Sequence, residues 1–168
     1  MKTLITTALV ASLAAPALHA AEATADVQDR DGNRLGAVLV RDTPSGVALA
    51  TLTLNDLPEG VHGVHLHETG DCSANDFKSA GGHVAGDRKH GVMVEGGLHP
   101  GDMPNLTVKS NGVGEVEYFL PFLNVSDHLL DEDGAAFIMH KGVDDYESQP
   151  SGDAGDRIAC GEFTERTE

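Results

Sequence analysis

Histidines are concentrated in one part of this chain. Six of the nine fall between residues 61 and 102, and another, His140, lies further along. Six of these seven, joined by one aspartate, form a candidate donor set: His65, His67, His83, His90, His99, Asp102 and His140. Imidazole nitrogens and carboxylate oxygens are ligands of copper and zinc. The set is large enough to hold two metal ions.

Two of these histidines are two residues apart. Val64-His65-Leu66-His67 lies in an alternating run, and side chains two apart on a strand share a face. His65 and His67 would therefore point the same way, while Val64 and Leu66 enter a hydrophobic core. A single histidine on a strand is usually an ordinary polar residue, but this clustering favours a metal site. His62 stands outside the pattern and is interpreted as a structural hydrogen-bonding residue.

The donors fit two kinds of site. Four imidazoles without a thiolate suit copper or zinc, and three imidazoles with a carboxylate suit a closed tetrahedral zinc site. Both sites can be filled if one histidine serves twice, because an imidazolate can bind a metal ion through each ring nitrogen. The residue types alone leave open which histidine that would be.

Short alternating runs separated by turn sequences predict the elements that must position these donors. Strands are expected at residues 35–41, 47–54, 61–67, 114–119 and 135–140. Stretches rich in Gly, Asp and Pro at 68–105 and 141–157 predict two long loops, and such loops in a compact domain are commonly functional. The economical assembly is an all-β sandwich or barrel whose loops carry the metal donors.

Residues 1–20 have the pattern of a secretory signal peptide. Lys2 precedes an apolar stretch from Leu4 to Leu13, and small residues follow near Ala20. A transmembrane anchor is the alternative, but the apolar stretch is shorter than the ~20 residues that cross a bilayer. Residues 21–168 are then expected to form one exported domain with a single core, its start defined to within a few residues.

Acidic residues outnumber basic ones by 27 to 11, which gives a formal charge of −16. Such a surface repels phosphate backbones and anionic lipids. We therefore expect no nucleic-acid and no membrane partner, and interpret the acidity as a source of solubility. The sequence leaves open whether the protein is a monomer or a homodimer.

The chain has two cysteines, Cys72 and Cys160. Because an exported protein meets an oxidising compartment, a disulfide between them is expected. The bond would close a loop of 88 residues, by subtraction of the two numbers. The alternative is a pair of free thiols or copper ligands.

Five ordered motifs lie beyond residue 20. They are His62-Gly63-Val64-His65-Leu66-His67-Glu68, Gly70-Asp71-Cys72-Ser73-Ala74, Ser79-Ala80-Gly81-Gly82-His83, His99-Pro100-Gly101-Asp102-Met103-Pro104-Asn105 and Arg157-Ile158-Ala159-Cys160-Gly161. Together they closely resemble copper/zinc superoxide dismutases of the bacterial exported type. The resemblance covers nearly all of residues 21–168. It implies a Greek-key β-sandwich or barrel, immunoglobulin-like in architecture, with two long functional loops.

Carried over residue by residue, the resemblance also implies the two metal sites. Copper would be bound by His65, His67, His83 and His140. Zinc would be bound by His83, His90, His99 and Asp102, so that His83 bridges the ions. Asp144 would orient ligands of both metals, Arg157 would stand beside the copper channel, and Cys72 would pair with Cys160.

The implied reaction converts superoxide to dioxygen and hydrogen peroxide by alternate reduction and reoxidation of the copper. His83 would leave copper in its reduced state and carry a proton, and Arg157 would dock the anion. Zinc has no redox chemistry here and would order its loop. The location would be the periplasm in a Gram-negative source and the outer surface otherwise. Two alternatives are a noncatalytic copper-binding module, which Arg157 disfavours, and a copper-only enzyme, which His99 and Asp102 disfavour.

Two departures from the family pattern carry expectations of their own. The interval between His83 and His90 is about one residue short and lacks the usual Phe-Asn-Pro, which predicts a looser zinc loop. Asp156 directly precedes Arg157, and further acidic residues follow His140, at Asp145, Glu147 and Asp153. An acidic rim predicts slower catalysis than in relatives with a more positive channel, with Lys141 or Lys78 assisting Arg157.

Overall fold

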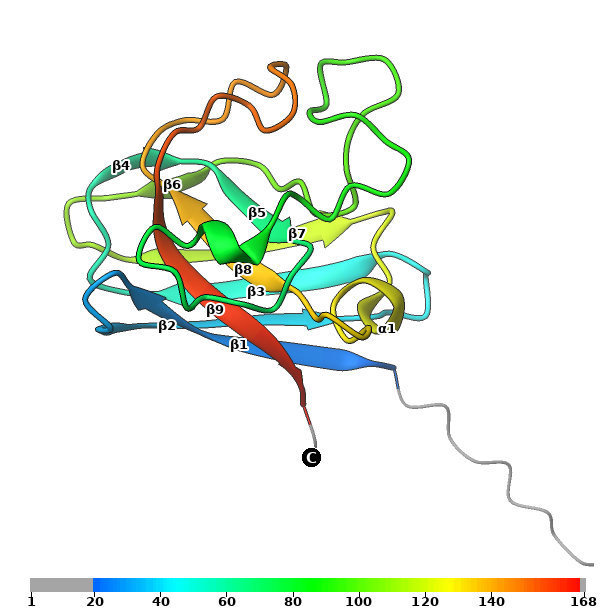
Figure 1. The fold of residues 1–168 in the computed structure, drawn as a ribbon, viewed down its shortest axis with the longest axis horizontal. Helices are drawn as coiled ribbons and strands as arrows, with labels where there is room; N and C mark the ends of the chain where they lie inside the picture. The colour runs from blue at the N-terminus through cyan, green and yellow to red at the C-terminus, as the bar shows by residue number, and fades with distance from the viewer. Residues whose placement is uncertain (1–19, 167–168) are drawn as a thin grey trace, which may run out of the picture.

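The structure, a computed structural model, describes residues 20–166 (Figure 1). The expected signal peptide at residues 1–20 therefore lies outside the described residues, apart from Ala20. Within residues 20–166, no helix has the length and apolar character needed to cross a membrane.

The described chain is built almost entirely from strands. They are β1 Glu22–Asp29, β2 Arg34–Arg41, β3 Ala48–Leu54, β4 Gly60–His62, β5 Val64–His67, β6 Leu106–Val108, β7 Gly114–Leu120, β8 Ala136–His140 and β9 Arg157–Glu165. One helical turn, α1 (Val125–His128), and one 3-10 turn, η1 (Lys78–Ala80), complete the secondary structure of residues 20–166.

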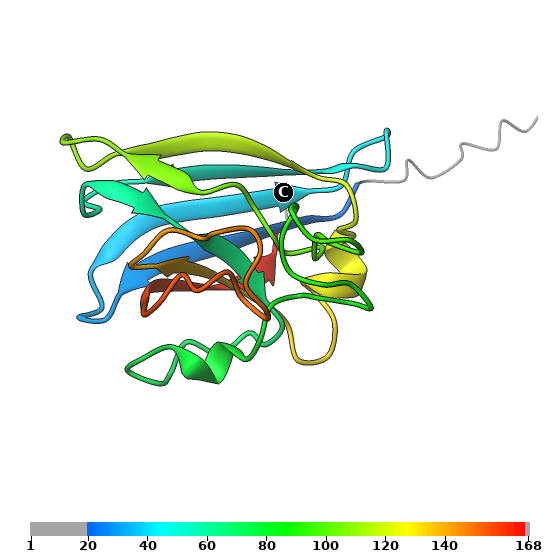
Figure 2. The same ribbon diagram turned by 90° about the horizontal axis from the view of Figure 1, so that it is seen from above.

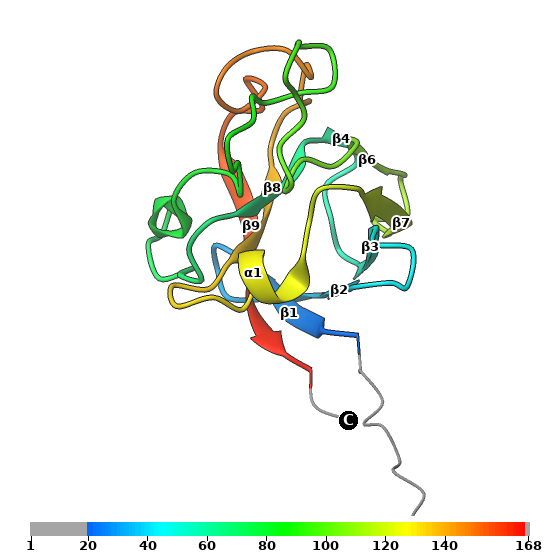
Figure 3. The ribbon, with the colours of Figure 1, turned by 90° about the vertical axis from the view of Figure 1, so that its right-hand side faces the viewer.

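All strand pairs are antiparallel, and the connections cross the fold. One sheet has the order β5-β8-β9-β1-β2-β3-β7, and a second pairs β4 with β6. After the β1-β2-β3 meander, the chain crosses to β4 and β5, returns through β6 to place β7 beside β3, and crosses again to insert β8 between β5 and β9. The large sheet curls so that β4 and β6 stand between its two edges (Figures 2 and 3). The predicted all-β Greek-key architecture is confirmed.

The main core fills the inside of the curled sheet. On β3, the alternating residues Ala48, Ala50, Leu52 and Leu54 are all buried, as the period of a half-buried strand requires. β8 is buried along its whole length because a loop also covers its outer face. There, Ile138 packs with Phe77 and the half-cystines Cys72 and Cys160 in a second, smaller core.

The strand predictions are confirmed, with one division. The expected run 61–67 is split into β4 and β5 at Gly63. A Cβ at Gly63 would lie 2.9 Å from Ala154 Cβ, so only glycine lets the loop after β8 close against this point. The predictions omitted β1, β6 and β9, although β1 alternates Ala23, Ala25 and Val27 with polar residues.

Both predicted loops are confirmed. Residues 68–105 contain only η1, and residues 141–156 contain neither helix nor strand. The part of the first loop after η1 and the second loop stand at the same end of the molecule, at the top of Figure 1, while the part with η1 lies over β8 and β9. The candidate donors that do not lie on β5 or β8 all belong to the first loop.

Candidate metal centre

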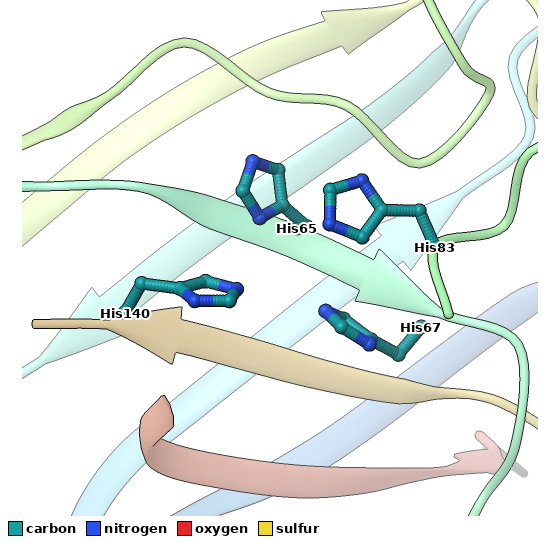
Figure 4. A group of neighbouring side chains, drawn as sticks. All are labelled: His65, His67, His83 and His140. Atoms are coloured by element: carbon teal, nitrogen blue, oxygen red, sulfur yellow. The ribbon is translucent and has the colours of Figure 1, made fainter. Parts of the chain in front are cut away.

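Four histidines from different parts of the fold converge beside β5 and β8 (Figure 4). His65 and His67 lie on β5, and His140 ends β8. His83 lies in the loop 68–105, where its backbone forms an isolated β-bridge with His67. One ring nitrogen of each lies within 4.8 Å of the others, and all four residues are buried. We call His65, His67, His83 and His140 the four-histidine cluster.

The arrangement of β5 agrees with the alternation in its sequence. His65 and His67 both contribute to the cluster, while Val64 and Leu66 belong to the main hydrophobic core. His62, on β4, contacts two carbonyl oxygens: Nδ1 lies 2.9 Å from that of His140 and Nε2 lies 3.1 Å from that of Pro58. It supports the end of β8, as its structural interpretation predicted.

In each ring of the four-histidine cluster one nitrogen has no partner. The buried atoms without a hydrogen bond include His65 Nδ1, His67 Nε2, His83 Nε2 and His140 Nε2. A buried polar atom without a partner costs free energy and is rare in native proteins. Four such nitrogens facing one point therefore indicate a cation-binding site, and four imidazoles without a thiolate fit copper.

The protein fixes the opposite nitrogen of these rings. His67 Nδ1 lies 3.0 Å from the carbonyl oxygen of Gly81, and His140 Nδ1 lies 3.0 Å from that of Gly155. A carbonyl oxygen can only accept, so both rings donate from Nδ1 and keep their lone pair on Nε2. Both lone pairs are thereby available to a metal ion.

A second group of donors shares His83. The Nδ1 atoms of His83, His90 and His99 lie 3.0, 3.0 and 3.2 Å from Asp102 Oδ1. His99 Nδ1 makes no hydrogen bond and is another buried nitrogen without a partner. We call His83, His90, His99 and Asp102 the aspartate cluster. Three imidazoles and one carboxylate around one point are the ligands of a closed zinc site.

His65 also approaches this second group, within 4.8 Å of donor atoms of His83, His90 and Asp102. Its free Nδ1 belongs to the four-histidine cluster, however, and its Nε2 donates to Asp144. We therefore place His99 in the aspartate cluster, and His65 outside it.

Asp144 joins the two clusters. Its Oδ2 accepts from His65 Nε2 at 2.6 Å, and its Oδ1 accepts from His90 Nε2 at 3.0 Å. Asn105 holds the Asp144 backbone, accepting from its N–H at 2.8 Å and donating to its carbonyl at 2.9 Å. At Gly152, where φ is +69°, a Cβ would lie 2.0 Å from Asp144 Oδ1, so this close approach requires glycine.

His90 differs in protonation from the rings of the four-histidine cluster. Burial lowers the pKa of every ring in the four-histidine cluster, to about 3 for His65 and about 4 for His140. At His90 burial acts the same way, but hydrogen bonds to Asp102 and Asp144 outweigh it and raise the pKa to about 9. The four-histidine rings are therefore neutral at pH 7, the form that binds metal ions.

A cleft of about 450 Å³ opens onto the four-histidine cluster. Its walls include His67, His83 and His140, and the charged residues are Arg30, Asp76, Lys78, Asp156 and Arg157. Arg157 is held in place because its two Nη atoms donate to the carbonyl oxygens of Phe77 and Gly81, each at 2.7 Å. A fixed positive charge thus stands beside the imidazoles, in the position that the sequence motifs implied.

The charges along this cleft differ from the sequence expectation in four respects. Lys78 lines the cleft but pairs with Asp76 at 3.0 Å. Lys141, the alternative to Lys78 as an aid to Arg157, lines a separate pocket that shares Arg30 and Asp156 with the cleft. Among the acidic residues of the loop after β8, only Asp156 lines the cleft. Arg30, which the sequence did not single out, lines it as well.

The expected disulfide is present. Cys72 and Cys160 are bonded, with Cα atoms 5.9 Å apart, and no free cysteine exists in the described chain. The bond ties the segment that leads to Phe77 onto β9, which begins at Arg157. It therefore connects the two parts of the chain that place the arginine.

Residues 35–163 match the family "Copper/zinc superoxide dismutase (SODC)". The chain belongs to this family. The buried clusters fit its copper and zinc sites, and the resemblance seen in the sequence motifs is confirmed.

Relatives in the superoxide dismutase family cover most of the chain. It is 42% identical over 146 residues to "Superoxide dismutase (Cu-Zn)" of Caulobacter vibrioides, covering 83% of each chain. It is 39% identical over 142 residues to "Superoxide dismutase (Cu-Zn) 1" of Aquifex aeolicus, covering 82% of this chain and 84% of that one.

Solved structures agree in fold. A SOD-like protein from Bacillus subtilis superposes with a TM-score of 0.77 at 35% identity, covering 82% of this chain and 95% of that one. The Cu/Zn superoxide dismutase from Brucella abortus gives a TM-score of 0.69 at 26% identity, covering 84% of this chain and 98% of that one. The Greek-key dismutase fold therefore extends over most of the described residues.

Arg88 braces the interval between His83 and His90. The Arg88 side chain donates to the carbonyl oxygens of Gly97 and Leu98, and its guanidinium carbon lies 3.8 Å from the centroid of the Phe122 ring. Because Leu98 directly precedes His99, the arginine connects the segments that carry two histidines of the aspartate cluster. This contact opposes the looseness that the short interval predicts.

Replacing Arg88 by alanine is expected to speed zinc loss about tenfold, with copper retention unchanged, because partners that orient metal ligands commonly contribute 10- to 100-fold in affinity. Metal analysis after timed dialysis against a chelator measures both rates. Lys89→Ala is the matched control, since it removes the same charge from an exposed neighbour. Equal zinc retention in the two variants would contradict the bracing role.

The metal-free protein is expected to be most stable near pH 6.5. Below that pH His65 and His140 are protonated in the unfolded chain but stay neutral in the folded protein, because burial lowers their folded pKa values to about 3 and 4. Stability should therefore fall by about 2 kcal/mol or more between pH 6.5 and 4.5.

At His90 the sign is reversed. Its folded pKa of about 9 stabilises the protein below pH 6.5, and this contribution is lost as the pH rises from 6.5 to 9. Urea midpoints of chelator-treated protein between pH 4.5 and 9 measure both slopes. A urea midpoint that increases as the pH is lowered from 6.5 would contradict the expected loss of stability in acid.

Proposed function

We propose that this chain is a superoxide dismutase whose copper is held by the four-histidine cluster and whose zinc is held by the aspartate cluster. The copper ligands are His65, His67, His83 and His140. The zinc ligands are His83, His90, His99 and Asp102, with His83 as the bridge. One observation carries the proposal: free, buried ring nitrogens converge at the base of a cleft that also contains a fixed arginine.

A copper ion in this site supplies one-electron redox chemistry, by which one superoxide gives up an electron to become dioxygen and another superoxide accepts it. Arg157 docks the anion, because its guanidinium is held beside the cluster and keeps its charge. Two protons complete hydrogen peroxide, and His83 would hold one of them on Nε2 when that nitrogen is not bound to copper. The other ring nitrogen, Nδ1, remains directed at Asp102.

Asp144 is a positioning residue for both sites. It accepts from His65 Nε2 and from His90 Nε2, so it orients one ring of each cluster. Such a carboxylate fixes the ring tautomer and makes the ligand nitrogen more basic. Zinc, without redox chemistry of its own, orders the loop and the bridging ring.

The dismutase domain is residues 21–168, and residues 1–20 are a signal peptide removed on export. A disulfide supports an oxidising location, which is the periplasm if the source is Gram-negative. The acidic surface supports the absence of nucleic-acid and membrane partners. In solution the protein is a monomer or a homodimer. Mass spectrometry of the exported protein tests the cleavage, and analytical ultracentrifugation tests the assembly.

Metal analysis combined with pulse-radiolysis measurement of superoxide decay tests the activity. Protein loaded with both metals should contain one copper and one zinc per chain and consume superoxide catalytically, while chelator-treated protein should not. Full copper binding without catalysis would favour a noncatalytic copper-binding protein. Equal activity of the loaded and metal-free forms would exclude the proposed metal chemistry.

A further inference from the structure

The charges of four residues around the cleft nearly balance one another. Arg157 contributes a positive charge, held in place by two backbone carbonyl oxygens. The Lys78 ammonium pairs with Asp76, so this lysine and this aspartate largely cancel one another. Asp156 adds a negative charge to the same wall. A superoxide anion approaching the cleft therefore meets little net attraction from these four residues.

Arg30 is different. It lies in the turn between β1 and β2, lines the cleft, and donates from Nε to the carbonyl oxygen of Arg157 at 2.9 Å. Within residues 20–166, its two Nη atoms make no hydrogen bond and no carboxylate oxygen lies within 4.0 Å of them. The side chain is exposed, so an anion can reach it.

Two aspartates, Asp29 and Asp31, flank Arg30 in the sequence, and the turn engages the carboxylate of the first. Asp29 Oδ1 accepts from the backbone N–H groups of Asp31 and Asn33, each at 2.9 Å, and Oδ2 accepts from Asn33 Nδ2 at 2.9 Å. The carboxylate is thus directed into the turn. Its hydrogen bonds shape the turn from which Arg30 extends to the cleft.

We propose that Arg30 is the principal steering cation of this enzyme, attracting superoxide to the cleft where Arg157 docks it. The inference rests on the proposed function, because it needs an anionic substrate. The chain carries a formal charge of −16, so its general field repels superoxide. Within about a Debye length, ~8 to 10 Å, one unpaired cation at the entrance offsets that repulsion. The Nε bond to the Arg157 carbonyl holds Arg30 at this entrance.

Three variants of Arg30 distinguish an effect of its charge from an effect of its hydrogen bond to Arg157. Arg30→Glu is expected to lower kcat/KM for superoxide about fivefold at low ionic strength, Arg30→Ala about twofold to threefold, and Arg30→Lys by less than about 1.5-fold. Added salt should slow the wild type and speed Arg30→Glu, with copper and zinc contents unchanged in every variant.

The matched control is Arg41→Glu, which changes the net charge by the same amount. Arg41 is exposed and ends β2, whose length places it ~23 Å along the hairpin from the Arg30 turn. Its kcat/KM and salt dependence should stay within about 1.5-fold of the wild type. If Arg41→Glu matched Arg30→Glu, net charge alone would explain the effect and the proposal would be overturned.

A purely structural role for Arg30 would give another result. Lysine retains the charge but cannot reproduce the Nε bond to Arg157, so Arg30→Lys would then be as slow as Arg30→Ala, with an unchanged salt dependence. That outcome would overturn the steering role.

Azide titration of the copper-loaded protein, followed by its absorption band, tests Arg30 without turnover. Azide should bind Arg30→Glu several-fold more weakly than the wild type, and Arg30→Lys with nearly wild-type affinity. If the wild type bound both metals but did not consume superoxide, the proposed function would fail, yet the azide comparison would still decide whether Arg30 attracts anions. Equal azide affinity in all variants would overturn the inference.

Discussion

Replacing His83 by alanine is expected to release zinc, to weaken copper binding, and to lower superoxide consumption at least about 100-fold. His83 contributes Nε2 to the four-histidine cluster and directs Nδ1 at Asp102 in the aspartate cluster. As the two clusters are defined above, His83 is the one residue of the described chain that belongs to both. A single truncation there removes a ligand from each proposed site, and metal analysis with a superoxide-decay assay measures both losses.

Two further substitutions separate the bridge from an ordinary ligand. His90→Ala removes a ring of the aspartate cluster alone, so it should lower zinc content and leave copper bound. His128→Ala removes a partly exposed ring on α1 whose hydrogen bonds, within the described residues, go to Asn124 alone, and it should change neither metal. If His83→Ala kept both metals at wild-type affinity, the proposed bridge would be wrong.

Removing the disulfide is expected to lower the free energy of unfolding of the metal-free protein by about 4 kcal/mol. The bond closes a loop of 88 residues, and in the chain-entropy model this closure destabilises the unfolded chain by ~4 to 5 kcal/mol. Cys72→Ala with Cys160→Ala avoids leaving a polar group in the small core that also contains Phe77. Urea unfolding of the metal-free protein measures the change without a contribution from metal binding.

The same double variant should also weaken anion binding. Phe77 supplies a carbonyl oxygen to Arg157, and the disulfide ties the segment before Phe77 to β9. When that segment loosens, Arg157 loses a fixed partner beside the cleft. Wild-type protein treated with a reductant is the control, and it should reproduce both effects. An unfolding free energy within about 1 kcal/mol of the oxidised wild type would contradict this account.

The sequence by itself determined the strands and the donors that depend on local patterns. Alternation on β3 and β5 is a property of neighbouring residues, so the buried faces could be predicted, including the common side of His65 and His67. Gly, Asp and Pro content marked both long loops. The donor types restricted the metals to copper and zinc, and the ordered motifs identified the family. The local patterns did not predict the short strand β6 or the strands β1 and β9 at the two ends of the described chain, although β1 carries the expected alternation.

Only the tertiary structure decided which charges surround the cleft. Arg30 and Arg157 are 127 residues apart, and they meet because β1 pairs with β9 and brings the β1–β2 turn beside the start of β9. Lys141 directly follows a cluster histidine yet lines another pocket, while Arg88 contacts carbonyl groups of residues 97 and 98. Such contacts depend on how strands pair across the fold and how loops close over them, and these long-range contacts leave no periodic pattern in the local sequence.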